Sequence, residues 1–255
     1  MSFLRVRNRY DPSSTSPFKL SRSKLEFFLN CPRCFYLDRR MGVVQPPTPP
    51  FNLNNAVDHL LKKEFDEYRV RGIPHPLMVE NGIEAVPFLH EKLDHWRDAL
   101  RGGIEFHHKP SNFVLTGGVD DLWVDARGRL IIVDYKATSK KESVNLEAPW
   151  QISYKRQMDM YAWLFRANGF QVAPMGYFVY CNALTVSDRF DRHLEFDVSV
   201  LPYSIQEEWV EGALLSAREC LIKSEEPPYT RDCKFCEYQQ ALSEVHQQMK
   251  FNLDV

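Results

Sequence analysis

The chain is 255 residues long, enough for one large domain or two small ones. Its composition, 44% hydrophobic and 26% charged, excludes a disordered protein, and no apolar run approaches the roughly 20 residues that span a bilayer. The first ten residues contain no apolar signal segment, which predicts a cytoplasmic protein without a membrane partner. The net charge of −2 neither indicates nor excludes a nucleic-acid substrate, because binding can depend on a local basic patch.

The N-terminal third predicts a basic arm followed by helices. Residues 1–40 carry nine Lys or Arg against three acidic residues, which fits either a nucleic-acid-binding patch or a solvated face. Residues 1–20 are polar and irregular, as in a flexible arm, and Ser23 and Glu26 then fit a capping box that would open a helix. Pro32 is expected to break this helix and to start another. Further helices are predicted over 55–71 and 87–101.

The middle of the chain changes from helical to strand patterning. In chain order, the sequence predicts two strands within 104–137, a helix over 149–167, two strands at 175–184 and 192–200, and a helix at about 204–223. The last helix is predicted from a second capping box, formed by Ser204 and Glu207. This order predicts a mixed α/β (α+β) fold with a helical N-terminal layer, because the steady alternation of a doubly wound sheet is absent from the pattern.

The strand LIIVDYKA at 130–137 carries a carboxylate and an ammonium at the end of an apolar run. Because side chains alternate along a strand, Asp134 and Lys136 share one face. The preceding strand supplies Asp120 or Asp121. Two carboxylates that converge from neighbouring strands form an oxygen-ligand site for Mg²⁺ or Mn²⁺, and a nearby Lys can orient the attacking water in phosphodiester hydrolysis. For an Asp-x-Lys pattern alone, a surface hairpin with a salt bridge is the alternative.

The hairpin is accompanied by further motifs in a definite order. They are GGVD at 117–120, DYK at 134–136, QMDMY at 157–161 and the N-terminal stretch SRSKLEFFLNCPRCFYLDRR at 21–40. Together these motifs resemble the RecB-like branch of the PD-(D/E)XK nucleases, which includes CRISPR-associated exonucleases and the nuclease modules of recombination helicases. The resemblance covers about residues 20–240 in element order.

This resemblance implies a fold, a domain organisation and a function. A restriction-endonuclease-like core sheet flanked by helices is expected as a single domain over 21–240, between the arm at 1–20 and a tail at 241–255. The implied activity is metal-dependent DNA hydrolysis in repair, recombination or defence, with DNA and a protein of such a complex as partners. The main alternative is a catalytically decayed module that binds DNA or a partner protein, and a hydrolase of another phosphoester would share the metal chemistry.

The resemblance also implies roles for individual residues. These are Asp120 and Asp134 as ligands of Mg²⁺ or Mn²⁺ together with the carbonyl of Tyr135, Lys136 as the water-polarising residue, and Gln157 and Tyr161 as residues that position the catalytic groups or the DNA backbone. Gln157 and Tyr161 are four residues apart, so they share one face of a helix. Asp121 points to the other side of its strand and is expected to be solvated or paired.

The RecB-like branch usually places a metal-binding His on an early helix, and here the candidates are Asp58 and His59. Apolar residues that include Leu60, Leu61 and Phe65 are predicted to define the buried face of this helix. At about 100° per residue, Asp58 lies at the edge of that face and His59 on the far side. We therefore expect Asp58 to be the inward metal ligand, with the family His replaced by a carboxylate. Alternatively, Asp58 only stabilises the start of the helix through its dipole.

Four of the six cysteines form two C-x-x-C pairs, Cys31 with Cys34 and Cys233 with Cys236. In a cytoplasmic chain such pairs are more often metal ligands than disulfides, so a single shared metal centre is predicted. The nuclease relatives with C-terminal cysteines imply a 4Fe–4S cluster, and a structural Zn²⁺ is the alternative. Cys181 and Cys220 are predicted to be small core residues.

The five tryptophans all fall within or beside predicted helices and strands. That placement predicts a core position for each of them, Trp150 included, rather than a role in stacking on nucleic-acid bases.

Overall fold

The structure, a computed structural model, describes residues 4, 7–47, 49, 51–186 and 188–253. Parts of the predicted arm (1–3 and 5–6) and of the predicted tail (254–255) lie outside the described residues. Contacts divide the chain into two compact units. The helical unit comprises Met1–Thr48, His107–Val114 and Glu211–Val255, and the sheet unit comprises Pro49–Phe106 and Leu115–Val210.

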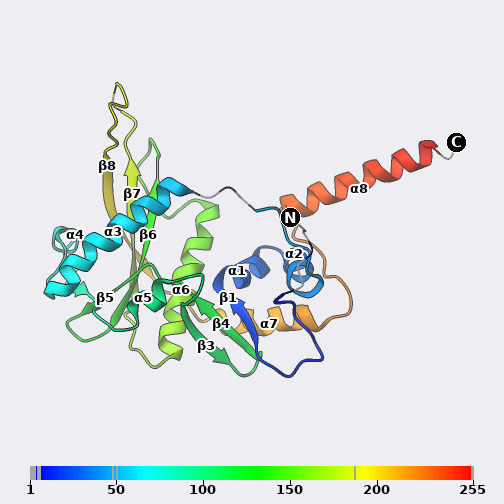
Figure 1. Cartoon of the computed structure of the whole chain (residues 1–255), viewed down its shortest axis with the longest axis horizontal. Helices are drawn as coiled ribbons and strands as arrows, with labels where there is room; N and C mark the ends of the chain where they lie inside the picture. Colours follow the sequence, from blue (N-terminus) through cyan, green and yellow to red (C-terminus); the bar gives the residue numbers. More distant parts are fainter. Residues whose placement is uncertain (1–3, 5–6, 48, 50, 187, 254–255) are drawn as a thin grey trace. The chain divides into compact units, whose positions relative to one another are not determined.

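The sheet unit is built on a five-stranded mixed sheet with the strand order β2-β5-β6-β7-β8 (Figure 1). β5 and β6 form an antiparallel hairpin in which Asp121 lies opposite Val133. β6 and β7 are parallel, because the chain crosses between them through α6, whereas β8 returns antiparallel to β7. The elements of this unit are β2 (Ala85–Pro87), β5 (Asp121–Asp125), β6 (Leu130–Thr138), β7 (Met175–Ala183), β8 (Phe196–Ser204), α3 (Asn52–Arg71), α4 (Pro76–Glu80), α5 (Leu93–Arg97), the 3₁₀ turn η2 (Pro149–Gln151) and α6 (Ile152–Ala167). The predicted mixed α/β class is confirmed.

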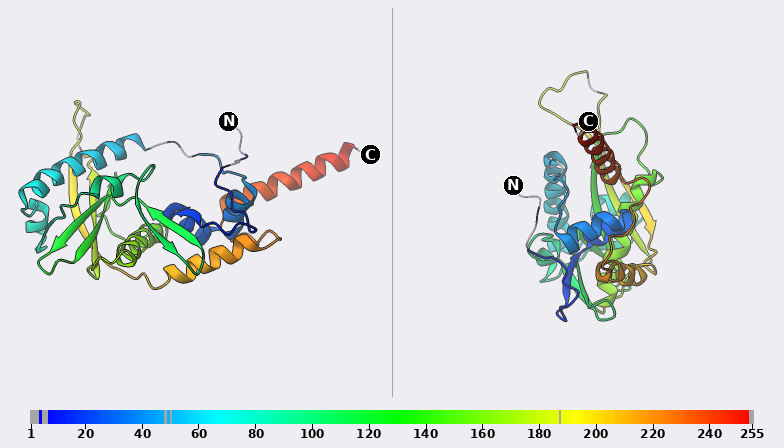
Figure 2. Two further views of the ribbon diagram at one scale, coloured as in Figure 1. Left: turned by 60° about the horizontal axis from the view of Figure 1, so that its bottom comes forward. Right: turned by 90° about the vertical axis from the view of Figure 1, so that its right-hand side faces the viewer.

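Helices α3 and α6 cover opposite faces of this sheet, as two further views also show (Figure 2). Val133 and Tyr135 of β6 share a core with Phe65 of α3. Ile132 and Asp134 are fully buried too, and they point to the other face, where Gln157 of α6 reaches Asp134. The alternation predicted for the strand at 130–137 is therefore present, and both faces of β6 are buried as expected for a central strand.

A buried ion-pair network connects α3 to β5. The fully buried carboxylate of Asp121 accepts hydrogen bonds from Arg69 at 2.5 Å, from Arg97 at 2.8 Å and from the Tyr135 hydroxyl at 2.7 Å. Both arginines also pair with Asp66. Asp121 is thus paired, one of the two outcomes expected for it. Because a buried charge is costly without such partners, this network fixes α3 across the hairpin.

The helical unit contains the N-terminal helices and the two last helices of the chain. Pro32 is the first residue of α2 and separates it from α1, and Gly42, with φ of 80°, ends the following turn of π-helix. Helix α1 begins at Arg22 rather than after Ser23, so the first predicted capping box does not form. The elements are β1 (Phe18–Ser21), α1 (Arg22–Asn30), α2 (Pro32–Tyr36), η1 (Leu37–Met41), α7 (Val210–Ile222) and α8 (Lys234–Leu253). The strands β3 (Ile104–His108) and β4 (Phe113–Gly117), of which only residues 107–114 belong to this unit, form a small sheet of order β1-β4-β3 with β1.

Two further predictions about local structure are wrong. Residues 87–101 form only the short helix α5, because the chain enters the strand β2 at Ala85 and leaves it at Pro87. Ser204 is the last residue of β8 and pairs with Met175, so its backbone is committed to the sheet and α7 starts at Val210. Residues 241–253, which were predicted to form a C-terminal tail, belong to α8. In the described part of the chain, none of the helices combines the length and apolarity needed to cross a bilayer.

Candidate active site

The β5–β6 hairpin brings two carboxylates and an ammonium together. Asp134 lies in the middle of β6 with a fully buried side chain, and the ammonium of Lys136 forms an ion pair with its Oδ2 atom. Asp120, immediately before β5, accepts a hydrogen bond of 3.0 Å at Oδ2 from the backbone nitrogen of Tyr135. The backbone of β6 therefore holds the Asp120 carboxylate beside Asp134 and Lys136.

Burial and the neighbouring charges perturb the titration of this group of side chains. Burial raises the pKa of Asp134 to about 7, and the nearby Asp120 carboxylate adds to the rise while Lys136 opposes it. Burial alone would lower the pKa of Lys136, but Asp134 and Asp120 together hold it above its ordinary value. Perturbed pKa values in neighbouring buried side chains are typical of functional sites. The arrangement carries more negative charge than one ammonium balances.

Two residues of α6 form hydrogen bonds to β6 and to the turn before β5. The side-chain amide of Gln157 donates to Asp134 Oδ1 at 2.7 Å and to the Tyr161 hydroxyl at 3.2 Å. The Tyr161 hydroxyl in turn donates to the backbone oxygen of Gly118 at 2.5 Å. A Cβ atom on Gly118 would lie 2.7 Å from the Cα atom of Ala99, so only glycine fits there. Gln157 and Tyr161 thus share one helix face, as predicted, and position Asp134 and the turn that carries Asp120.

Helix α3 contributes a third carboxylate and a second lysine. Asp58 is partly buried, and its pKa is raised by burial and by the Asp120 carboxylate, whereas His59 is exposed. The Lys62 ammonium lies 2.8 Å from Asp58 Oδ2 and 3.7 Å from Asp120 Oδ1. The structure therefore brings Asp58, not His59, toward the hairpin. Leu60 is 62% exposed, so its predicted place on the buried face is wrong.

Two further residues that the sequence did not predict, Lys62 and Tyr154, also contact this group of side chains. Lys62 was detectable in principle, because it lies one helical turn after Asp58 on the same face. Tyr154 lies three residues before Gln157 on α6, and the Lys136 ammonium is 4.5 Å from the centre of its ring. The ring and the carboxylates together restrict where the ammonium of Lys136 can lie.

Comparison with known proteins relates this geometry to a family. Residues 52–241, which include α3, the hairpin and α6, match the PD-(D/E)XK nuclease superfamily. The chain belongs to this superfamily. No curated protein matches it. The crystal structure of SSO0001 is similar at 16% sequence identity, over 87% of this chain and 84% of that chain, with a TM-score of 0.37.

Membership in the PD-(D/E)XK superfamily implies a nuclease that uses Mg²⁺ or Mn²⁺, and the observed sheet is consistent with its restriction-endonuclease-like fold. The residues present fit such an ion. Asp134 Oδ2 is buried, and its partner within the described residues is the ammonium of Lys136, which forms an ion pair with it. Asp58 and Asp120 complete an all-oxygen set of side chains. Mg²⁺ keeps several water ligands and needs only one or two carboxylates, so an open site suffices.

The raised pKa of Asp134 predicts how the stability of the fold depends on pH. Between pH 3.8 and about 7 the folded protein retains a proton on Asp134 that the unfolded chain has lost. The proton bound to Asp134 therefore stabilises the folded state. This stabilisation is complete below pH 3.8 and is lost as the pH rises toward 7. In metal-free protein at pH 8, Asp134→Asn is therefore expected to increase the free energy of unfolding by roughly 1–3 kcal/mol, since it removes a buried charge. Urea unfolding followed by tryptophan fluorescence measures this difference.

Asp125→Asn is the matched control for this prediction. Although burial opposes it, hydrogen bonds from Arg129 and Arg127 lower the pKa of Asp125, so its charged form is favoured in the folded state. The control variant is expected to lose stability at pH 8 and to be affected least at low pH. A loss of stability at pH 8 in Asp134→Asn as well would contradict the sign assigned to Asp134.

The helical unit contains a second group of potential metal ligands. The Sγ atoms of Cys31, Cys34, Cys233 and Cys236 all lie within 4.8 Å of one another, and three of these side chains are buried. Cys34 is 3.5 Å from Cys233 and 3.4 Å from Cys236, and Cys31 is 3.8 Å from Cys236. The two C-x-x-C pairs thus meet, as a shared centre requires. Cys181 and Cys220 are buried apart from this group, and burial raises the pKa of each thiol to about 11.

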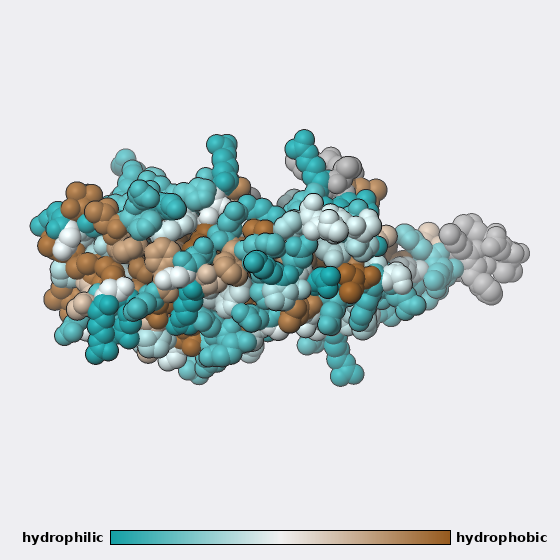
Figure 3. All heavy atoms as spheres, turned by 90° about the horizontal axis from the view of Figure 1, so that it is seen from below, coloured by the Kyte–Doolittle hydropathy of each residue, from teal (hydrophilic) through white to brown (hydrophobic). Residues whose placement is uncertain are grey.

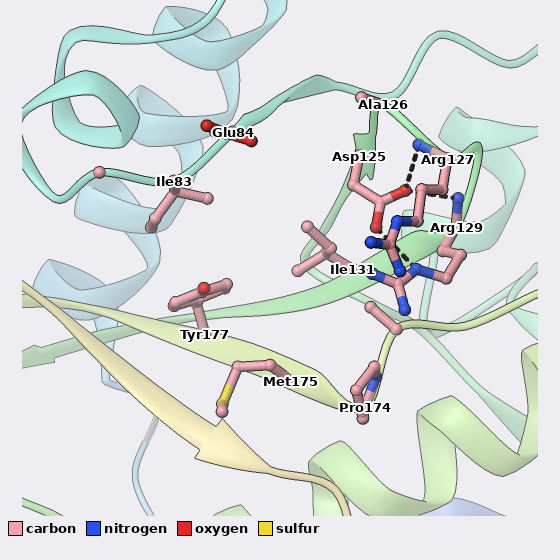
Figure 4. A pocket seen from close by; sticks show the side chains of 12 residues that line it. Ile83, Glu84, Asp125, Ala126, Arg127, Arg129, Ile131, Pro174, Met175 and Tyr177 are labelled. Atoms are coloured by element: carbon pink, nitrogen blue, oxygen red, sulfur yellow. Dashed lines mark hydrogen bonds and ion pairs between the residues drawn. The ribbon is translucent and has the colours of Figure 1, made fainter.

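A hollow of about 400 Å³ lies at the other end of β6, near Ile131 (Figure 4). Arg127 and Arg129 line it; the Arg129 guanidinium pairs with Asp125 through Nε at 2.8 Å, whereas Asp125 contacts Arg127 only at its backbone nitrogen, at 2.9 Å. This hollow contains neither Asp134 nor Lys136, so the candidate active site of this nuclease lies elsewhere on the sheet. On the face of the molecule seen from below, hydrophobic and hydrophilic side chains are interleaved (Figure 3).

Proposed function

We propose that this chain is a metal-dependent DNA nuclease of the RecB-like branch of its superfamily. The observation that supports the proposal best is the convergence of Asp120, Asp134 and Lys136 at the β5–β6 hairpin. A catalytically decayed module would have no need of a buried carboxylate with a raised pKa beside a second carboxylate. In the absence of a bound metal ion, that arrangement reduces the stability of the fold.

In the proposed site, each residue of the chain has a distinct task. Asp120 and Asp134, with the carbonyl of Tyr135, would hold Mg²⁺ or Mn²⁺, which supplies a water of lowered pKa and neutralises charge that develops on the phosphate. Lys136 orients the attacking water and carries positive charge into the same space. Gln157 holds the Asp134 carboxylate through its 2.7 Å hydrogen bond. Tyr161 holds the turn at Gly118 and so acts as a positioning residue.

Asp58 would complete the ligand set in place of the family His. Its raised pKa reflects burial and the Asp120 carboxylate, so a cation between the two would relieve a repulsion. Lys62 offsets part of this repulsion through its 2.8 Å contact with Asp58. In the metal-bound protein the Lys62 side chain would be free to turn toward a phosphate of the substrate.

We predict that Asp58→Ala weakens Mn²⁺ binding at least about tenfold, since it removes an inward carboxylate. His59→Ala is the matched control, because its side chain is exposed on the neighbouring position of the same helix. Isothermal titration of each purified variant with Mn²⁺ measures the difference. A larger loss in His59→Ala would return the ligand role to the histidine.

For the four cysteines we propose one shared metal centre in the helical unit. A single tetrahedral ion with Zn–S bonds of about 2.3 Å needs sulfur atoms about 3.8 Å apart. Three of the six separations are 3.4–3.8 Å and all six lie within 4.8 Å, which is closer to that value and favours Zn²⁺. In a 4Fe–4S cluster each thiolate binds a different iron, so the sulfur atoms stand further apart. Anaerobic purification distinguishes the two: a colourless protein with stoichiometric zinc is expected, whereas a brown one would establish the cluster.

The experiment that tests the proposed function is incubation of the full chain with labelled single-stranded and duplex DNA. Cleavage is expected with Mg²⁺ or Mn²⁺ and none with EDTA. DNA binding without cleavage under any of these conditions would instead support the decayed module. Cleavage of a small phosphodiester but not of DNA would indicate a hydrolase of another phosphoester.

A further inference from the structure

Trp150 is an exposed tryptophan beside the candidate active site. It lies in η2, the turn that opens α6, and its side chain is 53% exposed. The prediction that it belongs to the core is therefore wrong. The half of this large side chain that remains in water gains nothing from burial, and it is available to bind a ligand.

The backbone that carries Trp150 is firmly held. The neighbouring Gln151 is fully buried, and its side chain accepts a hydrogen bond of 2.8 Å from the Ala148 nitrogen. Its amide donates to the Asn145 oxygen at 2.6 Å and to the Tyr180 hydroxyl of β7 at 3.2 Å. The exposed ring is thus presented by a fixed turn, which lowers the entropy cost of binding a ligand to it.

A row of cationic and aromatic groups connects Trp150 to the active site. The Lys136 ammonium lies 4.5 Å from the Tyr154 ring, and that ring meets Trp150 edge to face at 5.3 Å. The Lys140 ammonium lies 5.1 Å from the centre of the Trp150 ring. Trp150 therefore lies within about three stacked nucleotides, at roughly 3.4 Å each, of the catalytic ammonium.

We propose that Trp150 and Lys140 form a stacking site for an unpaired nucleobase of the substrate strand. This proposal rests on the proposed nuclease function and names the strand form that the site takes. Aromatic rings stack on any base, and adjacent lysines pair with the phosphates. Between residues 136 and 156 the sequence has five basic and two acidic residues, which suits a polyanion. A base inside a duplex is already stacked on both sides, so the site favours single-stranded DNA or a frayed end.

The test is the affinity of the full chain for a fluorescent single-stranded oligonucleotide, measured without divalent metal so that cleavage plays no part. Trp150→Ala is expected to weaken this binding roughly 5- to 100-fold, and Trp150→Phe to restore most of it. Affinity for a blunt duplex should change less than twofold. Tyr238→Ala, at an aromatic residue that is 71% exposed in the helical unit, is the matched control and should bind like wild type.

A second arm uses oligonucleotides with one abasic nucleotide, placed at each position in turn. At one position the abasic change should weaken binding by the wild type but not by Trp150→Ala, as in a double-mutant cycle. The stacking site would be overturned, even if the protein cleaves DNA, by equal affinities of wild type and Trp150→Ala for the single strand. It would also be overturned if Trp150→Ala lost as much affinity for the duplex as for the single strand. A wild type that binds no DNA would overturn the proposed function itself, and the stacking site with it.

Discussion

Lys136→Met is expected to lower the rate of DNA cleavage by a factor on the order of 10² to 10⁴ while Mn²⁺ binding persists. Lys136 forms an ion pair with Asp134 at the candidate active site, and methionine keeps its length but loses its charge. The carboxylates that bind the ion remain, so the loss should appear in the rate constant of a single turnover and not in the Mn²⁺ affinity. Single-turnover cleavage with saturating protein and metal measures it.

Lys63→Met is the control for this variant, because Lys63 is an exposed lysine of α3 next to Lys62. It should cleave at the wild-type rate at equal ionic strength. Loss of Mn²⁺ binding together with cleavage in Lys136→Met would assign the lysine to the ligand site, and an unchanged rate would remove it from the chemistry.

The second large effect concerns the stability of the helical unit. Cys31 and Cys236 are separated by 205 residues, so a metal that joins them closes a very long loop and stabilises the fold. For structural Zn²⁺ sites the binding free energy is on the order of 10 kcal/mol and acts as folding free energy. We therefore expect Cys31→Ser to lose the bound metal and to expose α1, α2 and α8 to proteolysis, with cleavage sites mapped by mass spectrometry.

Cys220→Ser is the matched control, because Cys220 is a buried cysteine of the same unit that lies outside the metal group. It should keep full metal content and resist proteolysis like the wild type. A wild type that is purified without metal, or a Cys31→Ser variant that resists proteolysis like the wild type, would reject the shared centre.

Several features of the candidate site could be predicted because they depend on local geometry. Alternation along a strand placed Asp134 and Lys136 on one face, and the spacing of Gln157 and Tyr161 placed both on one face of α6. The angular position of Asp58 relative to His59 followed from the helical period in the same way. Each of these inferences needs only the dihedral angles of one element.

Other features depend on contacts between elements, which the sequence pattern does not contain. The capping box predicted at Ser204 does not form, because the backbone of Ser204 pairs with Met175 in the antiparallel β7–β8 pair. The position of Lys62 between two carboxylates depends on how α3 crosses the hairpin, which the buried Asp121 network determines. Trp150 was assigned to the core because it lies beside a predicted helix, whereas its exposure depends on the loop before that helix.

The most direct test of the central claim is the rate of DNA cleavage as Mn²⁺ is titrated, for wild type and Asp134→Ala side by side. Removing a buried ligand of the ion should cost several kcal/mol of barrier, a rate loss of at least about 10³. We predict a saturable rise in rate for the wild type, reversed by EDTA, and no rise for Asp134→Ala despite intact folding. Equal metal-dependent cleavage by both proteins would contradict the assignment of the active site to the β5–β6 hairpin.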